Sequence, residues 1–175
     1  MTRFHEQLKQ PATLAHDRAC AEIMKLPKSS VLSTFFPTWS RASLECVSLE
    51  WCPEEPVREP HRGNLVGFID LAALVQWVGA DKEDRQRYLG IEVKTSAESI
   101  GNAVRQAKTY RGGLVRCSHV PMTYGQVDLN RTYAYRLADV ALALPRDEIT
   151  EEVRLLTTGV PLIAWPLPDT FGLDD

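Results

Sequence analysis

The chain lacks several features that mark common classes of protein. Its 175 residues include only four cysteines, at positions 20, 46, 52 and 117, and no CxxC pair, which excludes a zinc ribbon. The cysteines also lack the clustered group that an iron–sulfur centre uses, so we expect reduced and mostly buried thiols. No apolar run approaches the roughly 20 residues of a membrane-spanning helix, and the first residues carry no apolar signal-peptide core. These absences predict a cytoplasmic protein that does not enter a membrane.

Motifs for other chemistries are missing as well. The four histidines show no HxxxH or related spacing, so we expect no histidine zinc site, although His61 or His119 could contact phosphate. Gly112-Gly113 lacks the following Lys-Ser/Thr of a phosphate-binding loop, and no serine lies in a nucleophile elbow. The sequence therefore indicates neither a nucleoside triphosphatase nor a serine hydrolase.

The chain has no overall excess of positive charge. Its net charge is −3, which is unfavourable for holding a polyanion unaided. Between Ser96 and Arg136, however, six Lys or Arg face two acids, a local charge of +4 that leaves −7 on the rest of the chain. A basic face on an acidic body permits nucleic-acid contact on one side and leaves room for a partner subunit.

Periodicity predicts alternating helices and strands. Helices are expected at 12–26, from 100 to the Gly112-Gly113 stop, and from the Thr150 cap to 156; strands are expected at 43–52, 64–77, 88–95, 138–144 and 160–165. The second and third strands should form a hairpin with a charged tip, residues 30–42 look irregular, and Pro53, Pro56 and Pro60 mark a loop.

We therefore predict a single α/β domain with a central mixed β-sheet flanked by helices. Residues 1–42 form an N-terminal helix and irregular segment packed on the core. Residues 43–175 form the core itself, with a basic insertion at about 112–136.

The residues that point to chemistry lie on two neighbouring predicted strands. Asp70 and the pair Glu92 and Lys94 each interrupt an otherwise apolar run, and a charge among apolar residues is costly unless it is paired or bound to a metal. Because strand side chains alternate, Glu92 and Lys94 point to one face, next to Asp70. Mg²⁺ prefers carboxylate and carbonyl oxygens, so Asp70, Glu92 and the carbonyl of Val93 would suit it. A salt bridge on the sheet surface is the alternative reading of Glu92 and Lys94.

These residues resemble the PD-(D/E)xK phosphodiesterase core of restriction enzymes and resolvases. The resemblance rests on Asp70, on Glu92-Val93-Lys94 in the next strand and on a following helix that bears Gln106, and it covers roughly residues 43–165. Ile69 stands where the name motif has proline. The resemblance implies a restriction-endonuclease-like core, αβββαβ with a further helix and strand. It also implies metal-dependent cleavage of nucleic acid, usually DNA, with Asp70 and Glu92 as ligands of Mg²⁺ or Mn²⁺, Lys94 catalytic and Gln106 in support.

In this family an acid from the first helix often completes the metal site. Glu22 is the candidate for that role, and Glu6, Glu45 and Glu50 are alternatives. Most glutamates on helices are simply solvated, which is the competing interpretation.

Nucleic-acid contacts are expected from the helix after Lys94 and from the basic segment. Asn102, Gln106 and Tyr110 recur every four residues and form a polar stripe that could face the site. The candidates for contact with nucleic acid are Arg105, Lys108, Tyr110, Arg111 and Arg116, followed by Arg131 and Arg136. Each could equally belong to a solvated face or a small core.

The sequence therefore predicts a metal-dependent nuclease, with DNA endonuclease activity as the leading hypothesis. Because the chain is short, target choice would come from a homodimer or from partner subunits of a defence, restriction or mobile-element system. Two alternatives stay open: an RNA-cleaving nuclease, and a non-catalytic nucleic-acid-binding or scaffold module that keeps a nuclease-like fold.

Overall fold

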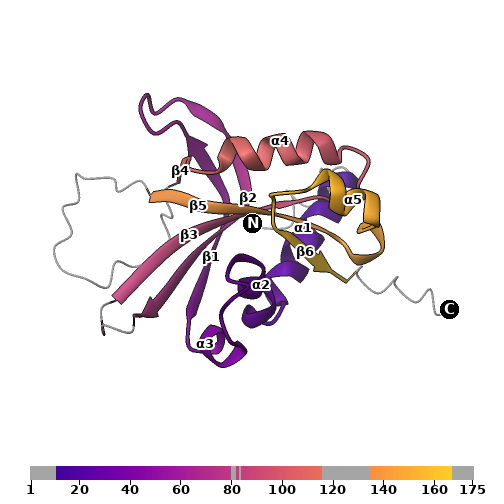
Figure 1. The fold of residues 1–175 in the computed structure, drawn as a ribbon. Coiled ribbons are helices and arrows are strands. Elements are labelled where there is room, and N and C mark those ends of the chain that lie inside the picture. The colour runs from indigo at the N-terminus through magenta and orange to yellow at the C-terminus, as the bar shows by residue number, and fades with distance from the viewer. Residues whose placement is uncertain (1–10, 80–81, 83, 116–134, 167–175) are drawn as a thin grey trace, which may run out of the picture.

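A computed structural model describes residues 11–79, 82, 84–115 and 135–166 of the chain (Figure 1). It has an α/β architecture, in which helices flank both faces of one mixed sheet. The helices are α1 (Pro11–Lys25), α2 (Lys28–Phe35), α3 (Arg41–Glu45), α4 (Ile100–Tyr110), η2 (Arg146–Glu148) and α5 (Glu151–Leu156); the strands are β1 (Ser48–Arg58), β2 (Leu65–Val78), β3 (Asp84–Val93), β4 (Leu114–Val115), β5 (Tyr135–Pro145) and β6 (Leu162–Trp165).

Within the described residues the sheet has six strands in the order β3-β2-β1-β4-β5-β6, and β3 also pairs with β5. Antiparallel pairing joins β1 to β2 and β4, β2 to β3, and β4 to β5. The β3–β5 and β5–β6 pairs are parallel. Because β3 contacts β5 while β1 reaches β5 through β4, the sheet curls on itself, and α4 lies across one of its faces (Figure 1).

Two layers of apolar side chains hold the helices to the sheet. On one face α4 buries Ala103, Val104 and Ala107 in a cluster that includes Leu142 and Leu144 of β5. On the opposite face α1 and α2 cover β3, β5 and β6, and a neighbouring cluster packs α2 and α3 on β2. The middle of β2, which carries Asp70, and the C-terminal end of β3, which carries Glu92, therefore lie between α1 on one face and α4 on the other.

Most of the predicted elements are confirmed with small shifts of their bounds. The helix predicted at 12–26 is α1, the antiparallel pair predicted at 64–77 and 88–95 is β2 and β3, and the run 138–144 lies within β5. Thr150 caps α5 as predicted, since its hydroxyl accepts from the Val153 backbone N–H at 3.2 Å. Gly112 follows α4 with φ 80°, which suits a glycine stop.

The segment from residue 28 to residue 58 differs from the prediction. Residues 30–42 are not irregular throughout, because α2 buries Val31 and Leu32, and Ser40 caps α3 by accepting from the Ser43 N–H. Strand β1 begins at Ser48 rather than at residue 43 and continues through Pro53 and Pro56, which the sequence suggested were in a loop. Beside β1 on its second edge, β4 pairs only through Arg58 with Leu114 in the part of the chain that the structure describes, and a strand bordering such an edge tolerates proline.

Among the described residues, no helix is both long and apolar enough to cross a membrane.

Candidate active site

The site begins where the ladder between β2 and β3 stops. Its last pair is Leu71 with Ile91, and continuing this register would set Asp70 opposite Glu92. Instead, the backbone N–H of Val93 donates to Asp70 Oδ2 at 2.7 Å. On β1, Glu54 lies between the residues that pair with Leu71 and Ile69, and its φ of 54° is rare for a residue with a side chain. The strands are thus locally distorted, and the Asp70 carboxylate is aimed at the end of β3.

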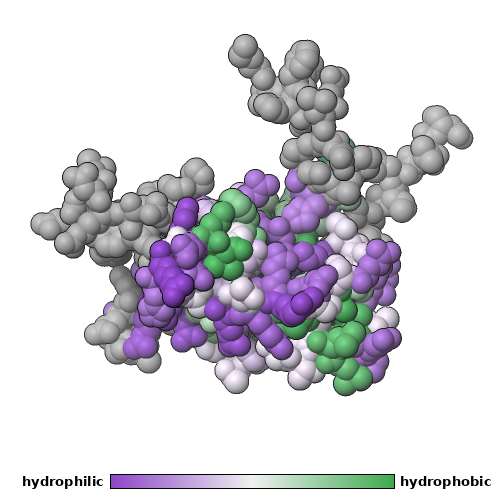
Figure 2. Space-filling model, turned by 90° about the horizontal axis from the view of Figure 1, so that it is seen from above, coloured by the Kyte–Doolittle hydropathy of each residue, from purple (hydrophilic) through white to green (hydrophobic). Residues whose placement is uncertain are grey.

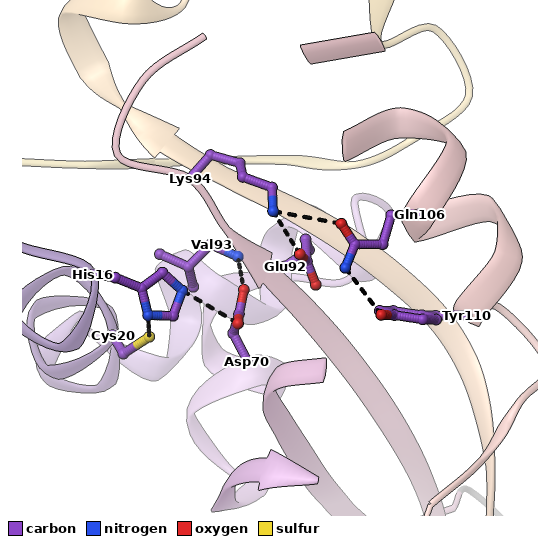
Figure 3. A network of polar contacts seen from close by, with 8 residues as sticks. All are labelled: His16, Cys20, Asp70, Glu92, Val93, Lys94, Gln106 and Tyr110. Carbon is purple, nitrogen blue, oxygen red and sulfur yellow. Dashed lines mark hydrogen bonds and ion pairs between the residues drawn. The ribbon is translucent and has the colours of Figure 1, made fainter. Parts of the chain in front are cut away.

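The second oxygen of Asp70 faces α1. His16 Nε2 lies 3.2 Å from Asp70 Oδ1, and the other ring nitrogen of His16 lies 3.9 Å from the Cys20 sulfur one helical turn on (Figure 3). The hydrogen bond to Asp70, reinforced by the contact with Cys20, raises the pKa of His16 from 6.5 to about 10. A protonated imidazole therefore neutralises Asp70 from the α1 side.

Glu92 lies deeper than Asp70. Its side chain is only 2% exposed; Oε1 accepts from Lys94 Nζ at 2.7 Å, while Oε2 is buried with no hydrogen-bond partner. Burial, together with the negative charge of Asp70, raises the pKa of Glu92 from 4.5 to about 7, although Lys94 and His16 act in the opposite direction. This carboxyl group has one oxygen satisfied and one without a hydrogen-bond partner among the described residues.

Lys94 is held by a short relay from α4. Gln106 Oε1 lies 3.5 Å from Lys94 Nζ, and Gln106 Nε2 donates to the Tyr110 hydroxyl at 2.9 Å (Figure 3). Because an ammonium has only hydrogens to donate, the amide oxygen is the end of Gln106 that must face it. Gly67 of β2 makes room for this relay, since a β-carbon there would overlap the Tyr110 hydroxyl. Lys94 keeps a side-chain exposure of 25%, so a substrate can reach it.

The donor set fits a hard divalent cation. A buried carboxylate oxygen without a partner is costly, and a metal ion is one of the few groups that satisfies it. Within a strand the N–H and C=O of one residue point to the same side, so the Val93 carbonyl lies on the side of Asp70, where the predicted third ligand belongs. Across the described ranges, no three His, Cys, Asp or Glu side chains already form a metal cluster. The cation would therefore draw Asp70 and Glu92 together.

His16 is a further possible ligand from α1. Imidazole binds metal only in its neutral form, so His16 would have to release its proton to take this role. A nitrogen ligand suits Mn²⁺ better than Mg²⁺, which prefers oxygen.

Glu22, the predicted acid from the first helix, is not brought to this site. Its carboxylate lies 2.8 Å from Lys25 Nζ on the surface of α1. Six residues separate Glu22 from His16, which turns its side chain about 120° away around the helix. Of the alternatives, Glu45 pairs with Arg41 and Glu50 is exposed on β1, while Glu6 lies outside the described residues. Helix α1 does reach the site, as predicted, but it presents a histidine.

The predicted nucleic-acid contacts fall into three groups. Arg105 and Lys108 are exposed on α4, where the Arg105 guanidinium bonds to Asn102. Arg111 is exposed too, and its Nε lies 3.4 Å from Asp139. Seen from the side that α4 covers, the surface is mainly hydrophilic (Figure 2).

Tyr110 behaves differently from this exposed group. It is only 4% exposed, and its ring belongs to the core beneath α4. It supports Gln106 instead of lining the surface. Arg116 and Arg131 lie outside the described residues.

Sequence reasoning missed His16 and Cys20. Their spacing of four residues within a predicted helix shows that they share a face. Nothing in the sequence shows that this face of α1 meets Asp70, because that contact depends on how α1 packs across β3 and β6.

Comparison of the chain with family models, with curated proteins and with solved structures finds no match in any of the three.

Proposed function

We propose that the chain is a metal-dependent nuclease of the PD-(D/E)xK type, with a restriction-endonuclease-like core, that cleaves DNA internally. The observation that carries the proposal is the partnerless Oε2 of Glu92, buried beside Asp70 and Lys94. A purely structural ion pair would be more stable without a second carboxylate nearby and without an unsatisfied oxygen, because both destabilise the fold. A site that takes up a cation explains both.

The residues have distinct roles in this proposal. Asp70 and Glu92, with the Val93 carbonyl, hold Mg²⁺ or Mn²⁺, which supplies charge neutralisation at phosphorus and an activated water. Lys94 donates hydrogen bonds to the attacking water or to a phosphoryl oxygen, where negative charge grows in the transition state. Gln106 keeps the Lys94 ammonium directed, and Tyr110 keeps Gln106 directed.

Protonation of Glu92 sets the pH range of the reaction. Its pKa of about 7 in the metal-free protein means that a proton competes with the cation at neutral pH. Metal affinity and cleavage should therefore both rise as the pH passes through 7.

DNA is the substrate we assign, reached with the help of a homodimer or partner subunits. The exposed cations of α4, Arg105 and Lys108, supply part of the grip on phosphate. A net charge of −3 favours help from another subunit, which fits a cutter that works inside a defence, restriction or mobile-element assembly.

The test is cleavage of circular plasmid, linear duplex DNA, single-stranded DNA and RNA, each in Mg²⁺ and in Mn²⁺. Nicking or linearisation of circles that Glu92→Ala loses is the expected result. Degradation from free ends alone would replace endonuclease by exonuclease, and cleavage of RNA alone would replace the substrate. Failure to cut any of the four, with no metal binding by calorimetry, would overturn the proposal in favour of a non-catalytic module.

A further inference from the structure

An aromatic cluster lies at the other end of β2 and β3, away from the acidic residues. Phe36 and Trp39 stack with ring centroids 4.7 Å apart, and Trp77 of β2 meets Trp39 edge-on at 5.4 Å. Both tryptophans are partly exposed and line a surface hollow of about 700 Å³, whose other walls include Thr38, Ser40 and Ser43. Such a hollow is wide enough for a flat ring and offers it both a π-face and hydroxyl groups.

Arg87 joins this hollow to a second one. Its guanidinium lies 5.8 Å from the ring centroids of both Phe36 and Trp77. Arg87 also lines a groove of about 270 Å³ between β3 and β5, together with Arg136 and Gln86. The two hollows therefore form one surface, which we call the tryptophan–arginine surface: Trp39, Trp77, Arg87 and Arg136.

The chemistry of the tryptophan–arginine surface selects a polyanion that carries flat rings. Among the described residues, no carboxylate lines either hollow. Arginine forks bind phosphate, and indole rings stack on bases of any sequence. Nucleic acid provides both groups on one chain, with the rings and the phosphates alternating along it.

The position of the surface distinguishes a single strand from a duplex. Five residues of β3 separate Arg87 from Glu92, which is about 17 Å at roughly 3.3 Å per residue. An odd number of residues places the two side chains on opposite faces of the sheet. A duplex with a persistence length of about 150 base pairs cannot bend between the faces over this distance. A flexible single strand can.

We propose that the tryptophan–arginine surface binds single-stranded nucleic acid, with bases stacked on Trp39 and Trp77 and phosphates on Arg87 and Arg136. Given the proposed nuclease function, on which this inference rests, the tryptophan–arginine surface holds an unpaired segment of nucleic acid that leads to or from the cleavage site.

The test measures binding without cleavage. A 12-nucleotide labelled single strand and a matching duplex are titrated in EDTA, by anisotropy, into the wild type and into a double variant, Arg87→Gln with Arg136→Gln. The control is Arg154→Gln, an exposed arginine on α5 that lines a different hollow. We expect the double variant to bind the single strand roughly 20-fold more weakly at 0.1 M salt, with a salt slope smaller by about 1.4, since each lost phosphate contact lowers that slope by about 0.7.

The tryptophans provide a second readout. Quenching of indole fluorescence by the single strand is expected in the wild type and should fall when Trp39 is replaced by leucine. Equal single-strand affinity for the double variant and for Arg154→Gln would overturn the proposal, as would an equal loss of duplex binding. Because EDTA removes any metal, a protein that binds here yet cuts nothing counts against the proposed nuclease alone.

Discussion

The two carboxylates of the site lie in contrasting surroundings. Asp70 is 19% exposed, and each of its oxygens has a partner, Val93 N–H for one and His16 for the other. Glu92 is 2% exposed, has one partner for two oxygens, and its pKa is raised to about 7. Two acids that sequence reasoning treats as equivalent ligands are therefore different in the folded protein.

The difference indicates that the two carboxylates have different roles in the folded protein. Asp70 is anchored, so it fixes how β2 meets the end of β3 and stabilises the metal-free protein. Glu92 is held in an unfavourable state that a bound cation would relieve, so it sets the affinity for metal. The predictions below test this division, from the largest expected effect to the smallest.

Replacing Lys94 by alanine should abolish cleavage while leaving both carboxylates in place. We expect a loss of at least about 10³-fold in kcat, because an ammonium that stabilises developing charge is removed from a water-poor site. Metal affinity, measured by calorimetry, should change much less. The control is Lys25→Ala, an exposed lysine on α1 that pairs with Glu22. Undiminished cleavage by Lys94→Ala would remove Lys94 from the mechanism.

Replacing Glu92 by glutamine should stabilise the metal-free protein at high pH. The folded wild type keeps a proton on Glu92 that the unfolded chain releases near 4.5, so this stabilisation is complete below pH 4.5 and is lost as the pH rises through about 7. Glutamine cannot ionise. Between pH 4 and pH 8, the difference in unfolding free energy between Glu92→Gln and the wild type should therefore change by about 3 kcal/mol in favour of the variant. Urea unfolding measures this difference. If the difference between Glu92→Gln and the wild type were the same at both pH values, burial would not be raising the pKa of Glu92.

Replacing Asp70 by alanine should lower the free energy of unfolding, which is the opposite of the change expected for Glu92→Gln. It leaves the buried Val93 N–H without an acceptor, which costs about 1–3 kcal/mol, and removes the partner of His16. Urea unfolding in EDTA measures the loss, and Asp70→Asn, which keeps an acceptor oxygen, serves as the milder control. If Asp70→Ala and Glu92→Gln shifted stability at pH 8 in the same direction, the contrast between the two acids would fail.

Gly67→Ala tests the relay behind Lys94. The added methyl group overlaps the Tyr110 hydroxyl, so the ring must move and Gln106 loses its support. We expect about 1–2 kcal/mol of destabilisation and, through Lys94, a fall of roughly tenfold in kcat. Gly101→Ala on α4 is the matched control, because its β-carbon meets nothing within 4 Å and alanine favours a helix. Equal kcat for the two variants would separate Gly67 from catalysis.

The sequence predicts the half of the site that depends on local spacing. Alternation sets Glu92 and Lys94 on one face, and the four-residue period of α4 brings Gln106 and Tyr110 to one side of it. These spacings depend only on the local strand or helix and not on how distant segments pack.

The other half depends on packing between distant segments. The contact of His16 with Asp70 joins positions 54 residues apart, and it forms because Ala19 and Ile23 of α1 pack on Ile91 and Val93. The prolines of β1 misled for a similar reason, since a strand at the border of a sheet tolerates proline, and only the assembled sheet shows that, among the described residues, β4 pairs with β1 at a single position. The restriction-endonuclease-like core and the nuclease activity stay predictions that the α/β sheet permits.

The most direct test is a calorimetric titration of Mn²⁺ into the wild type and into Glu92→Gln at pH 6, in two buffers of different ionisation enthalpy. At that pH Glu92 is mostly protonated, so metal binding should release its proton, and His16 adds a second if it becomes a ligand. The account predicts binding to the wild type with at least about one proton released, and at least tenfold weaker binding to Glu92→Gln with about one fewer released. Equal affinity and equal proton release for the two proteins would contradict a metal site built on Glu92.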